Sequence, residues 1–517
     1  MGSPNKLGEY GKDMLEFVEQ LWSDLEQHSP VPDVKPGFLL ERLPQEAPEK
    51  PQPWNDIMAD VKNIFVPGMT QFHNPNFHAY FEAGTSAASV VGDMLANSLA
   101  TPTFSWQSGP ASTELEMRMM DWFGKMLNLP DEFIFSSEKN TGGGVIQESN
   151  TGALTLMFTA AKMRLLRQLR GNDLDINPYD VTSKLVVFTS DQAHVSVQRV
   201  GTVTGIRVRT LQTDEKGSLR GETLKEAIKQ AENEGLFPLL VCATSGTTST
   251  CAFDNLQEIG EICQSKEVWL HVDAAYAGSF CVCPEFRPLI NGVQYVDSIC
   301  IGPQKAMRVH LPYCGLWVRD RYAMERTFDD DPIYLKHNYQ NKAVDYKNWS
   351  LYLTRPCRPL KMWFVLRLLG IEELQKHLRK QVRLAHEFEA LVRSDDRFEI
   401  VADVILGLVC FRLKGPDELS KRLLEMVNDQ GKIFINFTEY KGRYVIRFPI
   451  CSAAAESRHM TFAWSIIADA ANEVQSEHDQ EGLLLINEQA SELIISKDEL
   501  REYKKNGCIN GHFLQIR

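Results

Sequence analysis

A lysine and an aspartate accompany two short apolar runs of this sequence and could act together on a small molecule. Lys305 follows the run Ser298–Gly302, and Asp273 lies near the end of the run Val268–Ala275. An amine at the end of a strand can form a Schiff base with a carbonyl compound. A carboxylate that keeps a pyridine nitrogen protonated turns the ring into an electron sink. For each residue alone, a solvated lysine and a helix-capping aspartate remain alternatives.

The glycine-rich segment Thr141–Thr151 leads into a helical pattern at Leu154–Leu169. A helix N-terminus offers unpaired N–H groups and the positive end of a dipole, and both favour phosphate. Ser149 and Thr151 add hydroxyl donors. The segment therefore resembles a phosphate cradle, although it matches neither GxGxxG nor a P-loop, and a turn with an N-cap has the same appearance.

A histidine follows a further strand-like run. His194 closes the segment Ser190–His194, directly after Lys184–Ser190. An imidazole can stack on a cofactor ring and titrates near neutral pH, while a purely structural histidine is the alternative. Because ligands of parallel sheets bind outside the carboxyl ends of the strands, these four segments are expected to meet at one edge.

The elements that must position these residues follow an α/β pattern. Short runs that are apolar on both faces alternate with helical stretches, which predicts a mostly parallel sheet covered by helices on both sides. The predicted strands of this sheet are Lys184–Ser190, Leu239–Ser245, Val268–Ala275 and Ser298–Gly302.

Flanking patterns divide the chain further. Helical spacing at Gly8–Gln27 and the proline-rich connection after it indicate an arm whose apolar stripe needs cover from the body or a second subunit. A helix at Ile371–Val392 and strands at Leu408–Leu413 and Tyr444–Phe448 indicate a small α+β domain. The predicted division is an arm at 1–84, a large domain at 85–365, a small domain at 366–473 and a polar extension at 474–517.

Composition limits the partners. The formal net charge of −13 disfavours binding to nucleic acid. No stretch of this sequence approaches the roughly 20 apolar residues of a membrane span, so we expect a soluble protein without membrane attachment. The eleven cysteines lack CxxC spacing, which predicts reduced thiols, no metal site and a cytoplasmic location. A small molecule is the favoured ligand.

The order of these motifs resembles the pyridoxal-phosphate (PLP)-dependent group II decarboxylases. The motifs are GGGVIQ, SDQAH, ATSGTT, HVDAAYAGS and Pro-x-Lys, and the likeness extends over about residues 7–473. The segments PGMTQFHNPNFHAYF, FSWQSGPASTELEMRMMDW, DPIYLKH and LKMWFV are similar to the aromatic-L-amino-acid decarboxylase branch. This resemblance implies a fold-type I homodimer that binds PLP and converts an L-amino acid, of the dopa or 5-hydroxytryptophan type, to its amine and CO₂.

The resemblance also implies a role for each matching position. Lys305 would carry the cofactor, Asp273 would bind its ring nitrogen, and His194 would stack on the ring. Tyr334, on a mobile loop, would protonate the carbon that loses CO₂. Phosphate and cofactor contacts fall to Ser149, Asn150, Thr151, Thr248 and Ala275, and the substrate pocket to Tyr80, Phe81, Ala83, Phe104 and Gln304.

Several positions depart from the family pattern. The chain reads Gly302-Pro303-Gln304-Lys305-Ala306 where the family usually reads Asn-Pro-His-Lys-Trp. Other departures are Glu82 and Ala83 in place of Pro and Thr, and Glu148 and Gly152 in place of Gly and Glu. Two alternatives follow: a catalytically weakened homologue that acts as a binding protein, and an enzyme that forms an aldehyde. Retention of His194 and Tyr334 argues against the aldehyde-forming alternative.

Overall fold

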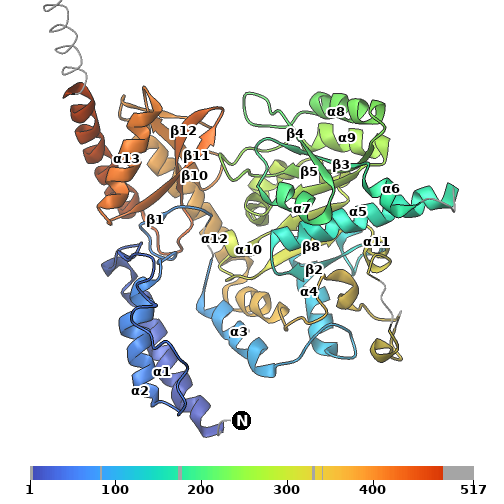
Figure 1. Ribbon diagram of the computed structural model, residues 1–517, viewed down its shortest axis with the longest axis horizontal. Helices are drawn as coiled ribbons and strands as arrows, with labels where there is room; N and C mark the ends of the chain where they lie inside the picture. The colour runs from blue at the N-terminus through green and yellow to red at the C-terminus, as the bar shows by residue number, and fades with distance from the viewer. Residues whose placement is uncertain (1–3, 82–83, 173–176, 329–331, 341, 481–517) are drawn as a thin grey trace, which may run out of the picture.

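The computed structural model describes residues 4–81, 84–172, 177–328, 332–340 and 342–480, and these form two sheets joined by a long helix (Figure 1). The large sheet has the strand order β2-β8-β7-β6-β5-β3-β4. Only β8 runs antiparallel to its neighbours, so the sheet is mostly parallel. Its strands are β2 (Gly143–Gln147), β3 (Leu185–Ser190), β4 (Arg207–Leu211), β5 (Phe237–Thr244), β6 (Trp269–Asp273), β7 (Ser298–Ile301) and β8 (Cys314–Val318).

Helices cover both faces of this sheet, which explains why its central strands are apolar throughout. Two separate hydrophobic clusters lie on the two faces. The covering helices include α4 (Pro110–Met126), α5 (Asn150–Asn172), α7 (Ser196–Thr204), α8 (Gly221–Asn233) and α9 (Leu256–Lys266). The shorter helices are α6 (Pro178–Thr182), α10 (Pro303–Ala306) and α11 (Arg321–Glu325). This architecture confirms the predicted fold-type I class, and each predicted strand of the sheet agrees with an observed strand to within two residues.

The small sheet has the order β1-β11-β12-β10-β9 and is packed against α13 (Asp417–Asp429). Its antiparallel strands are β9 (Phe398–Ile400), β10 (Leu408–Leu413), β11 (Phe434–Tyr440) and β12 (Arg443–Pro449). The fifth strand, β1 (Phe77–His78), pairs parallel with β11 although the sequence analysis placed it in the arm. The rings of Phe77 and Phe434 stack at 5.5 Å, and His78 stacks on Phe448 at 3.9 Å. Aromatic burial therefore holds the end of the arm in the small sheet.

Helix α12 (Pro359–Arg393) passes from α3 (Ala87–Leu99) beside the large sheet to β9 and β10 of the small sheet. It begins at Pro359, earlier than the predicted start at Ile371. A break at Gly370, with φ of 71°, separates two helical parts, and only the second part was predicted. Residues 457–480 are also helical and cross the boundary expected at residue 473. Short helical turns occur at Leu25–Gln27, Val61–Phe65, Val66–Gly68, Asp131–Phe133, Ala277–Val282, Pro284–Ile290, Val293–Tyr295, Ile333–Leu335 and Tyr346–Trp349.

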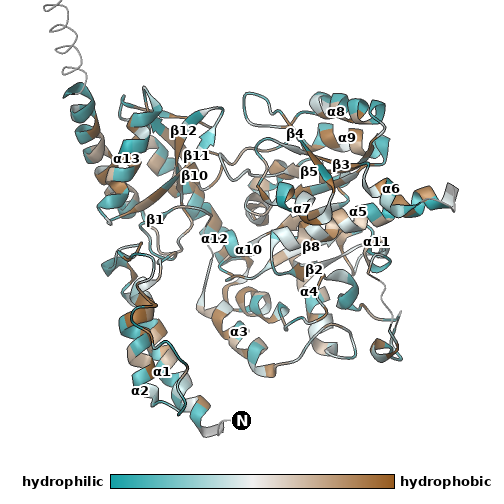
Figure 2. Cartoon of the chain, in the orientation of Figure 1, coloured by the Kyte–Doolittle hydropathy of each residue, from teal (hydrophilic) through white to brown (hydrophobic). Residues whose placement is uncertain are grey.

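The arm is formed by α1 (Pro4–Ser23) and α2 (Trp54–Asp60), which lie side by side away from the body (Figures 1 and 2). Tyr10 and Trp54 stack at 4.3 Å and connect the two helices. Apolar side chains remain exposed here at Met14, Leu15, Ile57 and Phe65, and on α3 at Met94, Leu95 and Leu99. An exposed apolar stripe of this extent is typical of a surface that a second chain covers.

No helix among the described residues has the length and apolar content to cross a membrane. Within the same ranges, no group of three or more metal-ligating side chains gathers. The structure describes ten cysteines, and all but Cys451 are buried.

A buried ion pair fixes the edge strand β2 to the rest of the large sheet. The Arg355 and Glu116 side chains are 0% and 1% exposed, and Arg355 donates to Glu116 Oε1 at 2.6 Å. The same oxygen accepts from the Ile146 N–H at 2.8 Å, and the Ile146 carbonyl accepts from Arg355 at 3.1 Å. The two charges are thereby paired, and both backbone polar groups of Ile146 are satisfied.

Replacing Glu116 with glutamine should leave Arg355 as an unpaired buried cation. We expect the free energy of unfolding to fall by about 3–5 kcal/mol, the usual cost of breaking a buried pair from one side. Urea unfolding followed by circular dichroism measures this change. The control is Glu132→Gln, which breaks the more exposed pair with Lys139 and should cost less than about 1 kcal/mol. Equal, small losses in both variants would contradict this interpretation.

Candidate active site

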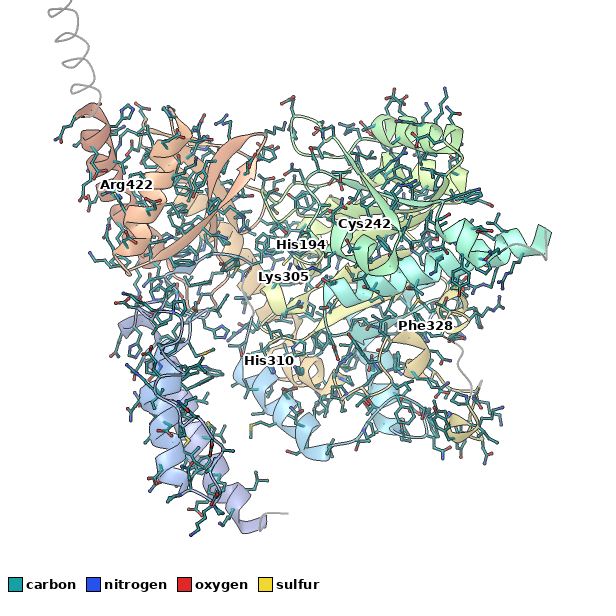
Figure 3. The ribbon with its side chains drawn as sticks, viewed as in Figure 1. His194, Cys242, Lys305, His310, Phe328 and Arg422 are labelled. Atoms are coloured by element: carbon teal, nitrogen blue, oxygen red, sulfur yellow. The ribbon has the colours of Figure 1, made fainter. Side chains whose placement is uncertain are left out.

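Lys305 lies on α10, directly after β7, near the junction of the two sheets (Figure 3). Its Nζ is 5.7 Å from the centroid of the Phe81 ring. The lysine also lines a cavity of about 270 Å³ with Ser86, Arg308 and His377. A half-buried amine beside a cavity and an aromatic face has the exposure that a Schiff-base lysine requires.

Asp273 is the last residue of β6 and pairs with Cys300 on β7. The residue is 8% exposed. Its Oδ1 accepts from the Ala275 N–H at 3.0 Å and from the Cys300 thiol at 3.8 Å. Within the described residues, this carboxylate accepts hydrogen bonds through Oδ1 alone. Oδ2 is therefore available to accept from a ring N–H, as a pyridinium partner requires.

Of the expected phosphate residues, Ser149 lies between β2 and α5, and Asn150 and Thr151 begin α5. Ser149 Oγ accepts from the Gly152 N–H at 3.1 Å, so this hydroxyl caps the first turn of α5. Asn150 Nδ2 donates to Cys300 Sγ at 3.3 Å and connects the helix start to β7. Thr151 follows within the first turn and is half-buried. The free N–H groups and hydroxyls of this helix start can hold a phosphate.

The glycines before this helix have a different role from the one the sequence suggested. Gly143 and Gly144 belong to strand β2 rather than to a phosphate-binding loop. A Cβ on Gly143 would come within 2.3 Å of the Phe135 ring, and one on Gly144 within 2.7 Å of Met120 Cε. These glycines are needed for close packing beneath the strand, and only the residues after Gln147 face the site.

His194 lies after β3 as an exposed residue whose imidazole is partly buried. Its Nδ1 accepts from the Ser196 N–H at 3.2 Å and lies 2.9 Å from Ser196 Oγ, so the neutral ring carries its proton on Nε2. Desolvation by neighbouring groups lowers the pKa of His194, and nearby Asp273 opposes that shift while Lys305 adds to it. The ring is therefore neutral at pH 7 and free to stack on a cofactor.

The turn that contains Thr248 closes another side of the site. Thr248 is half-buried, and the neighbouring Ser249 Oγ donates to Gln192 Oε1 at 2.8 Å, which joins this turn to the loop of His194. From the small sheet, Arg447 Nε donates to the Ser249 carbonyl at 3.3 Å. Ala275 is 7% exposed and lies two residues after Asp273.

The expected substrate residues are only partly brought together. Phe81 stacks on Tyr276 with ring centroids 3.6 Å apart, beside Lys305. Tyr80 is 52% exposed, with φ of 59°. Phe104 is half-buried, and its carbonyl accepts from the Lys347 N–H at 2.6 Å.

Gln304 precedes Lys305 and is half-buried. Its Oε1 is buried without a hydrogen-bond partner among the described residues, so this oxygen can accept from a bound ligand. Ala83, also expected in the substrate pocket, lies outside the described residues, as does Glu82.

Tyr334 is 78% exposed in the turn Ile333–Leu335, and no recorded contact connects it with Lys305 in a single chain. The loop after it is anchored by His337, whose Nε2 is 3.0 Å from Asp345 Oδ2. Asp345 Oδ1 in turn accepts from the Trp106 N–H at 2.8 Å. The loop that follows the predicted proton donor is therefore anchored, but the Tyr334 side chain does not contact the other described site residues of its own chain.

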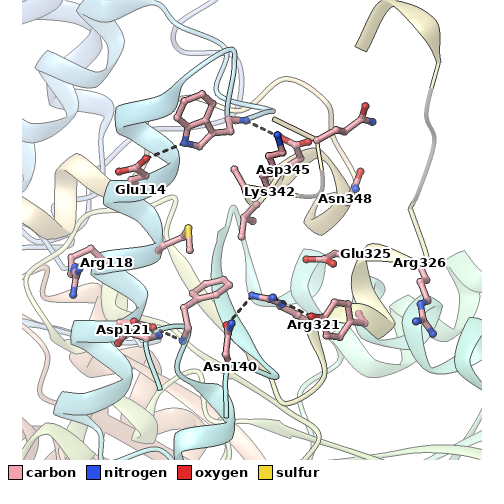
Figure 4. Close-up of a pocket in the computed structure, with 18 residues that line it drawn as sticks. Glu114, Arg118, Asp121, Asn140, Arg321, Glu325, Arg326, Lys342, Asp345 and Asn348 are labelled. Atoms are coloured by element: carbon pink, nitrogen blue, oxygen red, sulfur yellow. Dashed lines mark hydrogen bonds between the residues drawn. The ribbon is translucent and has the colours of Figure 1, made fainter. Parts of the chain in front are cut away.

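A second cavity of about 810 Å³ lies beside this anchored loop (Figure 4). Its lining includes Asp121, which accepts from the Phe135 and Ser136 N–H groups, and Asp345, which pairs with His337. None of the residues that the sequence analysis assigned to cofactor or substrate lines it. Of the described residues assigned to cofactor or substrate, Lys305 alone lines the cavity of about 270 Å³. The candidate active site is therefore defined by the strand-end residues around Lys305 and not by a cavity.

Sequence reasoning missed residues that connect the site without reacting. Cys300 contacts both Asn150 and Asp273, and Arg447 holds the Thr248 turn with its guanidinium carbon 5.1 Å from the Phe81 centroid. The position of Cys300 in the same strand-end run as Lys305 was a usable signal. Arg447 gave none, because it is far away in the sequence.

Comparison with known proteins shows the family of this chain. A family profile described as "Pyridoxal-dependent decarboxylase conserved domain" matches residues 36–414. The chain belongs to this family. It is a PLP-dependent carboxy-lyase whose reaction class is amino-acid decarboxylation. An amine at Lys305, the free Asp273 oxygen and the start of α5 fit the aldehyde, ring nitrogen and phosphate of PLP.

Relatives within this family differ in their named reactions. The chain is 44% identical to "Aromatic-L-amino-acid decarboxylase" of Mus musculus over 90% of this chain and 97% of that protein. It is 41% identical to "Histidine decarboxylase" of Mus musculus over 90% of this chain and 71% of that protein. The solved structure of Rhodiola rosea 4-hydroxyphenylacetaldehyde synthase is 36% identical, with a TM-score of 0.85 over 91% of this chain and 99% of that one. Family membership alone therefore leaves substrate and product open.

Lys305→Ala should abolish covalent attachment of PLP, because Lys305 provides the amine beside Phe81 and near Asp273. The measurement is mass spectrometry after borohydride reduction of protein mixed with PLP. Lys342→Ala, at an exposed lysine of the second cavity, is the control and should label like the parent. Stoichiometric labelling of another lysine in the Lys305 variant would refute the assignment.

Asp273→Asn should reduce kcat by roughly 100-fold or more, corresponding to about 2.7 kcal/mol. A neutral amide no longer favours the protonated ring nitrogen. PLP affinity should fall less, because Lys305 and the start of α5 are unchanged. Steady-state CO₂ release at saturating PLP, together with a PLP titration, separates the two effects. Unchanged turnover would show that Asp273 is only a structural cap.

Proposed function

We propose that this protein decarboxylates an aromatic L-amino acid of the dopa or 5-hydroxytryptophan type to the corresponding amine and CO₂. The observation that carries the proposal is the aromatic wall beside Lys305, formed by Phe81 stacked on Tyr276 at 3.6 Å. A planar substrate ring gains offset-stacked or edge-to-face contacts on such a wall. The 44% identity to a protein named aromatic-L-amino-acid decarboxylase supports the same substrate class.

Each site residue would have a separate role in the decarboxylation. Bound PLP supplies an electron sink for the bond to the carboxylate. Lys305 holds the cofactor aldehyde, Asp273 keeps the ring nitrogen protonated, and neutral His194 covers the ring. Ser149, Asn150 and Thr151 fix the phosphate at the start of α5. Once CO₂ has left, the Cα atom needs one proton, which the phenol of Tyr334 would donate.

Formation of an aldehyde is the second candidate outcome. The exposed position of Tyr334 in a single chain favours it, since an enzyme whose donor fails to close over the site leaves the reacting carbon open to oxygen. The structural relative named 4-hydroxyphenylacetaldehyde synthase shares the fold. Retention of both His194 and Tyr334 supports the amine as the main product.

We also propose a homodimer in the cytoplasm. The exposed apolar residues of α1, α2 and α3 support a second copy as their cover, and the exposure of Tyr334 supports delivery of its loop to a partner. Nine buried free cysteines suit a reducing compartment.

The direct test is an assay of PLP-loaded protein with dopa, 5-hydroxytryptophan, tyrosine and histidine. CO₂, amine, aldehyde and peroxide are measured together. We expect kcat/KM for dopa or 5-hydroxytryptophan to exceed that for histidine by about tenfold or more, equivalent to about 1.4 kcal/mol of transition-state binding. Preference for histidine would overturn the substrate proposal. PLP binding with no turnover of any of the four would favour the weakened homologue.

Tyr334→Phe should change the product rather than the cofactor. The ring and its volume remain while the proton donor is lost, so less amine and more aldehyde, ammonia and peroxide are expected at unchanged PLP affinity. Tyr339→Phe, on the same loop, is the matched control. The same amine yield at the same rate without peroxide would refute the donor role of Tyr334.

A further inference from the structure

A buried arginine supports the segment that leads to the phosphate residues. Arg358 precedes α12, its side chain is 3% exposed, and its Nη1 donates to the Ile146 carbonyl at 2.9 Å. Its Nη2 donates to Glu148 Oε1 at 2.5 Å. Glu148 lies between Gln147, the last residue of β2, and Ser149, the cap of α5. The ion pair is therefore formed next to the expected phosphate position.

The charges in this region balance only if Glu148 is counted. Two buried cations, Arg355 and Arg358, both donate hydrogen bonds to the Ile146 carbonyl. Glu116 neutralises Arg355, and Glu148 neutralises Arg358. Burial lowers the pKa of Arg358, Arg355 adds to that shift, and the two glutamates oppose it. Without a carboxylate at position 148, one buried cation would lose its partner.

Glu148 is one of the departures from the family pattern, and its pairing with Arg358 bears on cofactor binding. A carboxylate beside a phosphate would weaken cofactor binding if it faced the phosphate. Here the Glu148 side chain is 47% exposed and bonded to Arg358, so one carboxylate oxygen is directed toward the start of α12. The positive charge of Arg358 offsets part of the carboxylate charge, which reduces the repulsion of a neighbouring anion.

We propose that Glu148 is a positioning residue for the cofactor phosphate, held away from the phosphate by Arg358 and fixing the peptide that leads to Ser149. Its pairing makes the negative charge compatible with phosphate binding at the start of α5. The inference rests on PLP binding at this helix start and is independent of which amino acid is the substrate.

The test measures the dissociation constants of PLP and of pyridoxal, which lacks the phosphate, for four proteins: parent, Glu148→Gln, Arg358→Met and the double variant. Glu148→Gln should change PLP affinity by no more than about threefold, because the glutamine keeps the hydrogen bond to Arg358. Arg358→Met frees the carboxylate and should weaken PLP binding by about tenfold or more. The double variant should recover at least half of that loss on a logarithmic scale, and pyridoxal affinity should change little throughout.

Two results would overturn the proposal. One is tightening of PLP binding by about tenfold or more in Glu148→Gln, because the carboxylate would then have been facing the phosphate. The other is a double variant as weak as Arg358→Met, because the effect would then be structural. Glu148→Gln keeps the hydrogen bond to Arg358, so the first comparison holds even where Arg358→Met fails to fold.

Controls separate this proposal from the proposed function. Glu132→Gln, at the Glu132–Lys139 pair outside the site, should leave PLP affinity unchanged. Ser149→Ala should weaken PLP but not pyridoxal. If neither Ser149→Ala nor the Arg358 variants discriminate PLP from pyridoxal, the phosphate lies elsewhere and the positioning role is wrong, whatever the substrate assay shows.

Discussion

The candidate site depends on a carboxylate buried in the large domain, Glu116, which accepts from both Arg355 and the Ile146 N–H. This oxygen fixes the edge strand β2 at the level where the phosphate segment begins. A strand in this position has a single sheet neighbour, β8. Buried charge thus supplies the rigidity that a second neighbouring strand would otherwise provide, and the residues that follow β2 acquire a defined place relative to Asp273 and Lys305.

Strand ends were the part of the site that could be predicted from the sequence. Lys305 and His194 follow apolar runs and Asp273 lies near the end of one. Parallel strands bring their carboxyl ends to one edge whatever the loops do. The roles of Gly143 and Gly144 could not be predicted, because a glycine needed for packing and a glycine that binds phosphate are the same residue in the same spacing. Only the rings packed beneath β2 distinguish them.

Long-range contacts explain most of the remaining differences. Strand β1 consists of two residues and has no periodicity to detect, and its place is decided by Phe434 and Phe448 far along the chain. The early start of α12 was hidden by Gly370, which reads as a helix end although helical turns lie on both sides of it. Tyr334 is exposed in a single chain, and the delivery of its loop to a second chain, as proposed above, is a feature that no local pattern describes.

The pairing of β1 with β11 can form only late in the synthesis of the chain. His78 Nδ1 lies 3.3 Å from the Pro449 carbonyl, a residue 371 positions later. At a synthesis rate of about 5–20 residues per second, the N-terminal segment would leave the ribosome roughly 20–70 s before its partner strands exist. During this interval the apolar faces of α1 and α2 have no small sheet to anchor them. A nascent chain of this protein therefore exposes the apolar residues of α1 and α2 before the strand that pairs with β1 has been synthesised. We expect early chaperone binding, or pairing between neighbouring nascent chains, during this interval.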